Sequence, residues 1–237
     1  ILEIIPGVSA WGTIISMILA SIYLPFIAAY FVIAFSIYWV LKTIFLSYHV
    51  RYNWKRLKHH MTLDWEKMVE KFSFDHLQHL VIFPFYKEPR EVLEGAIKGL
   101  LDSKYNKKKL IVVLAAEARA GEEATAMANE LAKQYGSHFG HFLVTSHPAD
   151  IQGELAGKGS NTHWALHQVH TQIIEPNRIP YKDILVSIFD VDTVIYPHYF
   201  NCLVWHFMTA AQPYKSAFQP VPLFTNNLWE APAISRV

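Results

Sequence analysis

Two carboxylates separated by one residue, Asp190 and Asp192, follow an apolar run directly. Five of the six residues in 184–189 (ILVSIF) are apolar, which is typical of a buried parallel strand. In an open α/β sheet the carboxyl ends of the strands line the ligand crevice. Side chains at positions i and i+2 of an extended chain point the same way. We therefore expect both carboxylates to face one hard cation, Mg²⁺ or Mn²⁺, which in turn holds a diphosphate.

A lysine flanked by glycines, Lys158, is the second candidate for phosphate chemistry. It stands where a helix is expected to begin, so its charge and the first backbone N–H groups could meet a phosphate together. The segment is not a Walker A loop, because the spacing from Gly153 to Gly157 is one residue short and Gly159 stands at the Ser/Thr position. A solvated surface lysine is the alternative interpretation.

These candidates lie in an alternation of strand-like and helix-like segments that begins near residue 79. Strands are predicted over 79–85, 110–116, 141–146 and 184–189, with helices over 89–103, 121–135, 160–174 and 197–211. Such alternation predicts an α/β fold with a mostly parallel sheet and right-handed crossovers. The last extended stretch, 216–224, contains Pro220 and Pro222 and is expected at a sheet edge or in a loop.

The N-terminal part of the chain is strongly apolar: Lys42 is the only charged residue from Ile4 to Tyr48. This run exceeds the roughly 20 residues that one helix needs to cross a bilayer. Pro25 divides it, so we expect two membrane helices, about 9–24 and 26–46, in a tight hairpin. One long tilted helix kinked at Pro25 is the alternative, and a buried soluble hairpin is the third.

Basic residues follow the apolar run, and no acidic residue stands between Glu3 and Asp64. The cations are Lys42, Arg51, Lys55, Arg56 and Lys58. By the positive-inside rule, the rest of the chain is expected in the cytoplasm, attached to the plasma (inner) membrane.

Three regions are therefore expected. They are a transmembrane hairpin over 1–50, a basic juxtamembrane linker over 51–78 that contains a short amphipathic helix at 61–78, and an α/β domain over 79–237. The formal net charge of +1 gives no indication of a nucleic-acid partner. The single cysteine, Cys202, excludes an intramolecular disulfide.

Three motifs together resemble membrane-bound family 2 glycosyltransferases, the processive-synthase-like group with a GT-A (Rossmann-like) fold. VIFPFYKEP resembles that family's opening signature, with Pro84, Tyr86, Glu88 and Pro89 in register. GKGSNTHWAL (157–166) resembles its glycine-lysine segment, and DVDT (190–193) resembles its Asp-x-Asp. FQPVPLFTNN (218–227) is similar to the strand that follows. The resemblance covers about residues 79–230.

The resemblance implies metal-assisted transfer of a sugar from a nucleotide donor, a UDP-sugar, to a glycan or lipid acceptor in polysaccharide biosynthesis. Asp190 and Asp192 would hold Mg²⁺ or Mn²⁺. The implied donor-binding residues are Pro84, Tyr86, Glu88, Glu117, Lys158 and Asp190.

Two departures from that family's pattern stand out. Glu117 stands near the position where the family has an Asp that contacts the base. The general base and a Gln-x-x-Arg-Trp motif should follow the Asp-x-Asp, yet Glu230 is the only acidic residue after Asp192. No general base is identified, and the sequence is expected to be a fragment that binds donor without transferring sugar.

Two other function classes compete with this interpretation. FDVDTV also fits a phosphotransferase resembling the haloacid-dehalogenase group, with Asp190 as nucleophile and Asp192 as acid/base. That group needs a downstream lysine and an acidic pair, whereas only Lys215 follows, and its motif usually stands on the first strand. A membrane-tethered, non-catalytic scaffold with a degenerate transferase domain is the other alternative.

Overall fold

The computed structural model describes residues 4–221 and divides the chain into two compact units, Ile1–Leu63 and Asp64–Val237. The first unit is helical and the second is an α/β domain.

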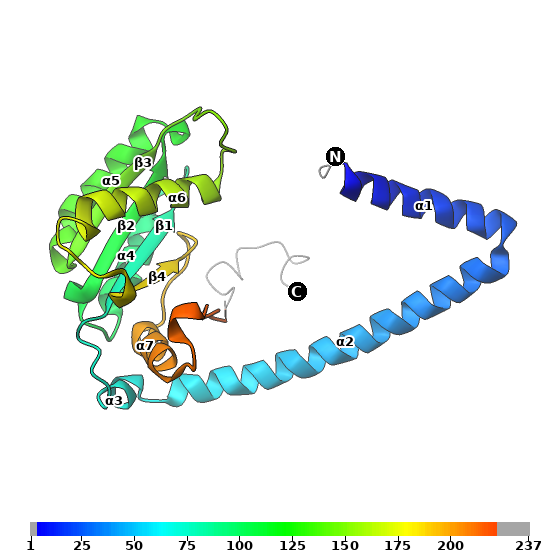
Figure 1. Cartoon of the computed structure of the whole chain (residues 1–237), viewed down its shortest axis with the longest axis horizontal. Coiled ribbons are helices and arrows are strands. Elements are labelled where there is room, and N and C mark those ends of the chain that lie inside the picture. The colour runs from blue at the N-terminus through cyan, green and yellow to red at the C-terminus, as the bar shows by residue number, and fades with distance from the viewer. Residues whose placement is uncertain (1–3, 222–237) are drawn as a thin grey trace. The chain divides into compact units, whose positions relative to one another are not determined.

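The first unit consists of α1 (Ile5–Tyr23) and α2 (Pro25–Thr62), separated by the single residue Leu24. Leu24 leaves the helical region, with φ −136° and ψ 58°, because a proline disfavours helical geometry in the residue before it. The two helices meet at Leu24 and separate from that point, like the arms of a V (Figure 1). Both helices are long and apolar enough to span a membrane.

The helix α2 continues well past the apolar segment that predicted its end near residue 46. Its hydrogen-bonded turns include the whole basic stretch and end at Thr62. Only a five-residue helix, α3 (Trp65–Val69), forms in the following region, where the side chain of Asp64 accepts a hydrogen bond from the N–H of Lys67. Of the amphipathic helix expected over 61–78, only the last two residues of α2 and the five residues of α3 are helical, and residues 70–77 form no helix.

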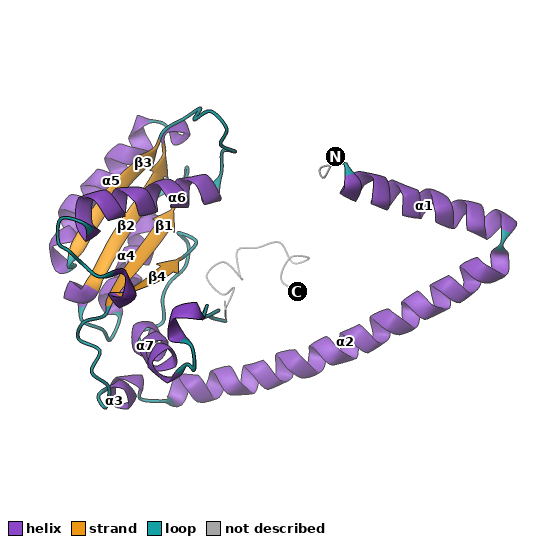
Figure 2. Cartoon of the chain, viewed as in Figure 1, coloured by secondary structure: helices purple, strands orange, loops and turns teal. Residues whose placement is uncertain are grey.

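The second unit contains a four-stranded sheet in the order β3-β2-β1-β4, in which all strands are parallel (Figure 2). The strands are β1 (Gln78–Pro84), β2 (Leu110–Glu117), β3 (His141–His147) and β4 (Ile184–Ile188). β1 and β2 are buried along nearly their whole length, which explains their continuous apolar sequences. The predicted α/β class with a parallel sheet is confirmed.

Helices cover both faces of this sheet. The helices α4 (Arg90–Asp102), α5 (Glu122–Tyr135) and α7 (Tyr199–Thr209) pack on the face that carries Val81, Phe83 and Leu114. The helix α6 (Lys158–Val169), continued by a π-helical turn over 170–174, packs on the face that carries Ile82 and Val113. Alternate residues of each strand thus supply the two halves of the core.

The order in which strands are added to the sheet reverses between β1 and β4. From β1 the chain adds β2 and then β3 on one side, and after α6 it returns to place β4 on the other side of β1. Because parallel crossovers are right-handed, this reversal sends α6 to the face opposite α4 and α5. Ligands of open α/β sheets bind outside the carboxyl ends of the strands at such a reversal.

β4 forms one edge of the sheet, and its side chains on the α6 face are poorly covered. Val186 and Ile188 are 50% and 46% exposed. The N–H of Phe189, just after β4, donates to the carbonyl of Ile82 in β1.

Candidate functional site

Asp190 and Asp192 lie two and four residues past β4, at the carboxyl edge of the sheet. The N–H of Thr193 donates to the carbonyl of Asp190 (2.9 Å), so the pair stands in a turn. The i, i+2 alternation expected for an extended chain is therefore replaced by turn geometry. Between the two acids, the side chain of Val191 is buried in the core and anchors the turn to the domain.

Lys158 contacts Asp190 although 32 residues separate them in the sequence: its Nζ donates to Oδ1 of the carboxylate. Lys158 is the first residue of α6, so the contact joins the start of α6 to the turn after β4. Both side chains are more than half exposed, and an exposed ion pair adds little stability. The pair instead places a cation beside the Asp-x-Asp, between β1 and β4, where the strand order reverses.

The start of α6 is fixed to the sheet by a buried amide. Asn161 donates from Nδ2 to the carbonyl of Ala115 near the end of β2 (2.8 Å). The same carbonyl also accepts from the N–H of Phe85, just after β1. Asn161 therefore ties the first turn of α6, and with it Lys158, to the ends of two strands.

The segment after β1 brings Pro84, Tyr86 and Glu88 to the same edge of the sheet. Pro84 is the last residue of β1. The carboxylate of Glu88 accepts the N–H of Tyr86 (2.6 Å) and so closes the turn that leads into α4. Glu88 thus has a local structural role in the conformation described, whereas the ring of Tyr86 is partly exposed.

Glu117, at the end of β2, is buried and paired with an arginine that sequence reasoning did not single out. Arg119 donates to one carboxylate oxygen of Glu117 from Nε (2.9 Å) and from Nη2. The guanidinium carbon lies 5.5 Å from the centre of the Tyr86 ring. Burying a carboxylate without a partner costs free energy. An arginine two residues after a glutamate at the end of a buried strand could therefore have predicted this ion pair.

The loop before α6 is attached to the end of β3. His147 is buried, and its Nε2 lies 3.0 Å from a carboxylate oxygen of Glu154 in that loop. The ring of Trp164 in α6 lies edge-on to His147, with 5.9 Å between the centroids. The sequence analysis did not predict these contacts. They fix the loop that precedes Lys158.

The described residues offer no group of three or more His, Cys, Asp or Glu side chains able to hold a metal ion. Among the described residues, the carboxylates that a divalent ion at this edge could use are those of Asp190 and Asp192. Mg²⁺ commonly binds in this way, with one or two carboxylates and the remaining positions filled by phosphate oxygens and water. The oxygen donors present fit such an ion.

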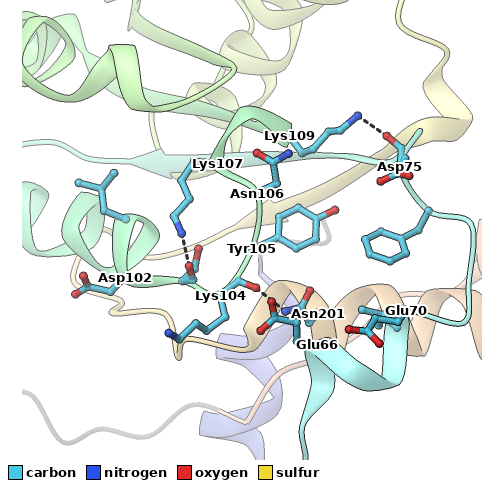
Figure 3. A pocket seen from close by; sticks show the side chains of 14 residues that line it. Glu66, Glu70, Asp75, Asp102, Lys104, Tyr105, Asn106, Lys107, Lys109 and Asn201 are labelled. Atoms are coloured by element: carbon cyan, nitrogen blue, oxygen red, sulfur yellow. Dashed lines mark hydrogen bonds between the residues drawn. The ribbon is translucent and has the colours of Figure 1, made fainter.

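Hollows open on the α/β domain near both ends of the strands, and two of them bear on the site. The larger, about 560 Å³ (Figure 3), lies at the amino ends of β1 and β2, where Asp75 and Lys109 precede the strands. It is at the opposite end of the strands from Asp190, and the amino groups of Lys107 and Lys109 in it already bind backbone carbonyls. The smaller, about 370 Å³, lies beside Glu117 and is lined by Ala118, Gly121, Glu122, Thr125, Ala126, Asn129 and Ser146.

Part of the expected acceptor side lies outside the described residues. Residues 218–221 of the FQPVPLFTNN segment form no helix or strand. Residues 222–227 and Glu230 fall beyond residue 221, so the structure assigns them no role.

The sequence was compared with models of known protein families and with curated proteins. No family model matches this chain, and no curated protein matches it significantly.

Proposed function

We propose that this chain is the donor-binding part of a membrane-bound glycosyltransferase with a GT-A architecture, using a UDP-sugar. The observation that carries the proposal is the contact between Lys158 and Asp190 where the chain reverses between β1 and β4. An arrangement of cation, paired carboxylates and helix start at this point suits a nucleotide diphosphate.

The diphosphate would bind between the turn after β4 and the start of α6. The ammonium of Lys158 and the first N–H groups of α6 offer positive charge to the phosphate oxygens. Asp190 and Asp192 would hold Mg²⁺ or Mn²⁺, which when bound acts as a Lewis acid that stabilises the departing diphosphate. Lys158 thus keeps Asp190 in place and contributes charge to the leaving group.

The nucleoside would lie toward the ends of β1 and β2. Tyr86 offers a partly exposed ring, and the hollow beside Glu117 provides space. Because Arg119 already pairs with the carboxylate of Glu117, the base would meet the Arg119–Tyr86 pair rather than a bare carboxylate. Glu88, engaged with Tyr86, would support the position of that ring.

The acceptor would be a glycan or a lipid, delivered at the membrane to which α1 and α2 anchor the domain on its cytoplasmic side. Deprotonating the acceptor hydroxyl needs a general base, and a positioned base contributes roughly 10²–10⁴-fold to the rate. No described residue is assigned this role. The proposal therefore concerns donor binding, which the described residues support.

The test is Mn²⁺-dependent binding of UDP to the purified chain, measured by calorimetry. Changing Asp190→Ala and Asp192→Ala together should abolish the Mn²⁺-dependent binding while leaving the thermal unfolding temperature nearly unchanged, because both acids lie in a surface turn. Lys158→Gln alone should weaken binding about tenfold, the loss expected for one charge-assisted contact.

A matched control is the pair Glu66→Ala and Glu70→Ala, which removes the same charge from exposed positions on or next to α3. This control should bind UDP as the unmodified chain does. Equal UDP affinity with and without Mn²⁺, or in the Asp190/Asp192 variant, would refute the proposal. Binding of a nucleotide sugar would also disfavour the scaffold alternative.

A further inference from the structure

The basic end of α2 projects beyond the part of the helix that a bilayer would cover. The helix has 38 residues, about 57 Å at 1.5 Å per residue, whereas the hydrocarbon core is about 30 Å thick. Its apolar segment, residues 25–46, spans about 33 Å on the same rise. The remaining 47–62 would therefore start at the headgroup layer and continue into water.

The height of each cation follows from the helical rise. Arg51 is five residues past Leu46, or about 7.5 Å along the axis, and Lys55, Arg56 and Lys58 stand at about 14 to 18 Å. Side chains of a helix lean toward its N-terminus, which here is the membrane end of α2. The long basic side chains would therefore lean back toward the headgroups. The distance between their charges and the headgroups would then be within the Debye length of about 8 Å.

No acid in the helix compensates these charges. The sequence has no Asp or Glu between Glu3 and Asp64, and all four cations are exposed. Within the described part of the chain, none of the four makes an ion pair, and Lys58 lies over the ring of Trp54 at 5.2 Å. Four uncompensated charges held at this height complement an anionic surface.

We propose that Arg51, Lys55, Arg56 and Lys58, here called the basic end of α2, bind the headgroups of anionic phospholipids. The inference rests on the membrane anchoring described under Proposed function and adds the lipid class. Because the cations are part of a helix that crosses the bilayer, lipid phosphates are their permanent neighbours. A cytoplasmic polyanion would first have to reach the same layer by diffusion.

The test uses the full chain reconstituted in phosphatidylcholine vesicles that carry trace spin-labelled phosphatidylglycerol or phosphatidylcholine. Electron paramagnetic resonance measures the motionally restricted fraction of each label. We expect the restricted shell to prefer phosphatidylglycerol by about threefold or more at low salt, since each cation near the surface attracts anionic lipid. The preference should decline toward one as the Debye length shortens from about 30 Å at 0.01 M to about 3 Å at 1 M salt.

Changing all four residues of the basic end of α2 to Gln should remove the preference. A matched control changes four exposed lysines of the other unit to Gln, and it should retain the preference. These lysines are Lys67, Lys71, Lys133 and Lys182.

The possible outcomes distinguish failure of the lipid inference from failure of the proposed membrane anchoring. A restricted shell with no preference between the two labels at low salt would overturn the lipid inference while supporting membrane insertion. A preference that survives the four-residue change, or that is insensitive to salt in the unmodified chain, would overturn it as well. Absence of any restricted lipid, together with extraction of the chain by alkaline carbonate, would instead refute the membrane anchoring.

Discussion

A buried histidine in β1 should make the α/β domain sensitive to acid. His79 is completely buried, with its ring edge-on to Tyr105 (4.8 Å) and Phe200 (4.9 Å). Neither ring nitrogen has a hydrogen-bond partner among the described residues. Burial lowers the pKa of His79 from its ordinary 6.5 to about 3, because the charged form would lose its hydration. His79 is therefore neutral in the folded domain at pH 5.

The magnitude follows from proton linkage. Above pH 6.5 both folded and unfolded states carry a neutral His79, so it contributes no pH dependence. Below this value the unfolded state binds the proton and the folded state does not, so stability falls as pH falls. With pKa values of about 3 and 6.5, the loss is about 2 kcal/mol at pH 5 and approaches about 5 kcal/mol below pH 3.

The variant His79→Leu removes the titrating group, and the assay is thermal unfolding of the full chain in detergent at pH 7 and pH 5. The unmodified chain should lose about 2 kcal/mol more than the variant between these values, or about 4–8 °C in unfolding temperature for a domain of this size. Any change in packing cancels, because it is present at both pH values. The exposed His138→Leu should behave as the unmodified chain does. Equal losses in the unmodified chain and in His79→Leu would refute the reasoning.

Two further substitutions test a close backbone contact in the α/β domain and the anchoring of α6, each by chemical denaturation of the full chain. Gly140→Ala should destabilise the domain by about 2 kcal/mol or more, because the added carbon would overlap the carbonyl of Lys108. Its control, Gly95→Ala, lies in α4 with open space around it and should stabilise by about 0.5–1 kcal/mol; destabilisation by both would count against the local clash. Asn161→Asp should cost about 2–3 kcal/mol, because an oxygen would replace the amide that donates to Ala115. Unchanged stability would show that this bond does not anchor α6.

Much of the α/β domain was predictable because its two central strands, β1 and β2, are buried on both faces. LIVVLAA and HLVIFPF are continuous apolar runs, and their burial in β2 and β1 is what such runs indicate. The strand order was beyond local reasoning, since no local pattern states that β4 returns to the far side of β1. Asp190 and Lys158 were both identified as candidates, but their contact depends on that return.

The features missed from the sequence depend on partners that are distant or on backbone details. Arg119 looks like an ordinary loop residue until Glu117 is known to be buried. The turn at Asp190 departs from the extended geometry because the N–H of Thr193 bonds to its carbonyl. The helix α2 was expected to end where its apolar sequence ends, yet backbone hydrogen bonds continue through Lys55 to Thr62, since lysine and arginine are good helix formers.

The position of β4 at the sheet edge has a consequence for handling the protein. The N–H of Phe189 points to β1, so the backbone groups of its neighbours Ile188 and Val186 point away from β1. The same two residues expose apolar side chains. Within residues 4–221 no strand pairs with this side of β4. A strand edge of this kind beside apolar side chains is a template on which another strand can be added, the usual start of edge-to-edge aggregation. Solubility of the isolated domain therefore depends on whether β4 is covered, independently of any ligand at the carboxyl ends of the strands.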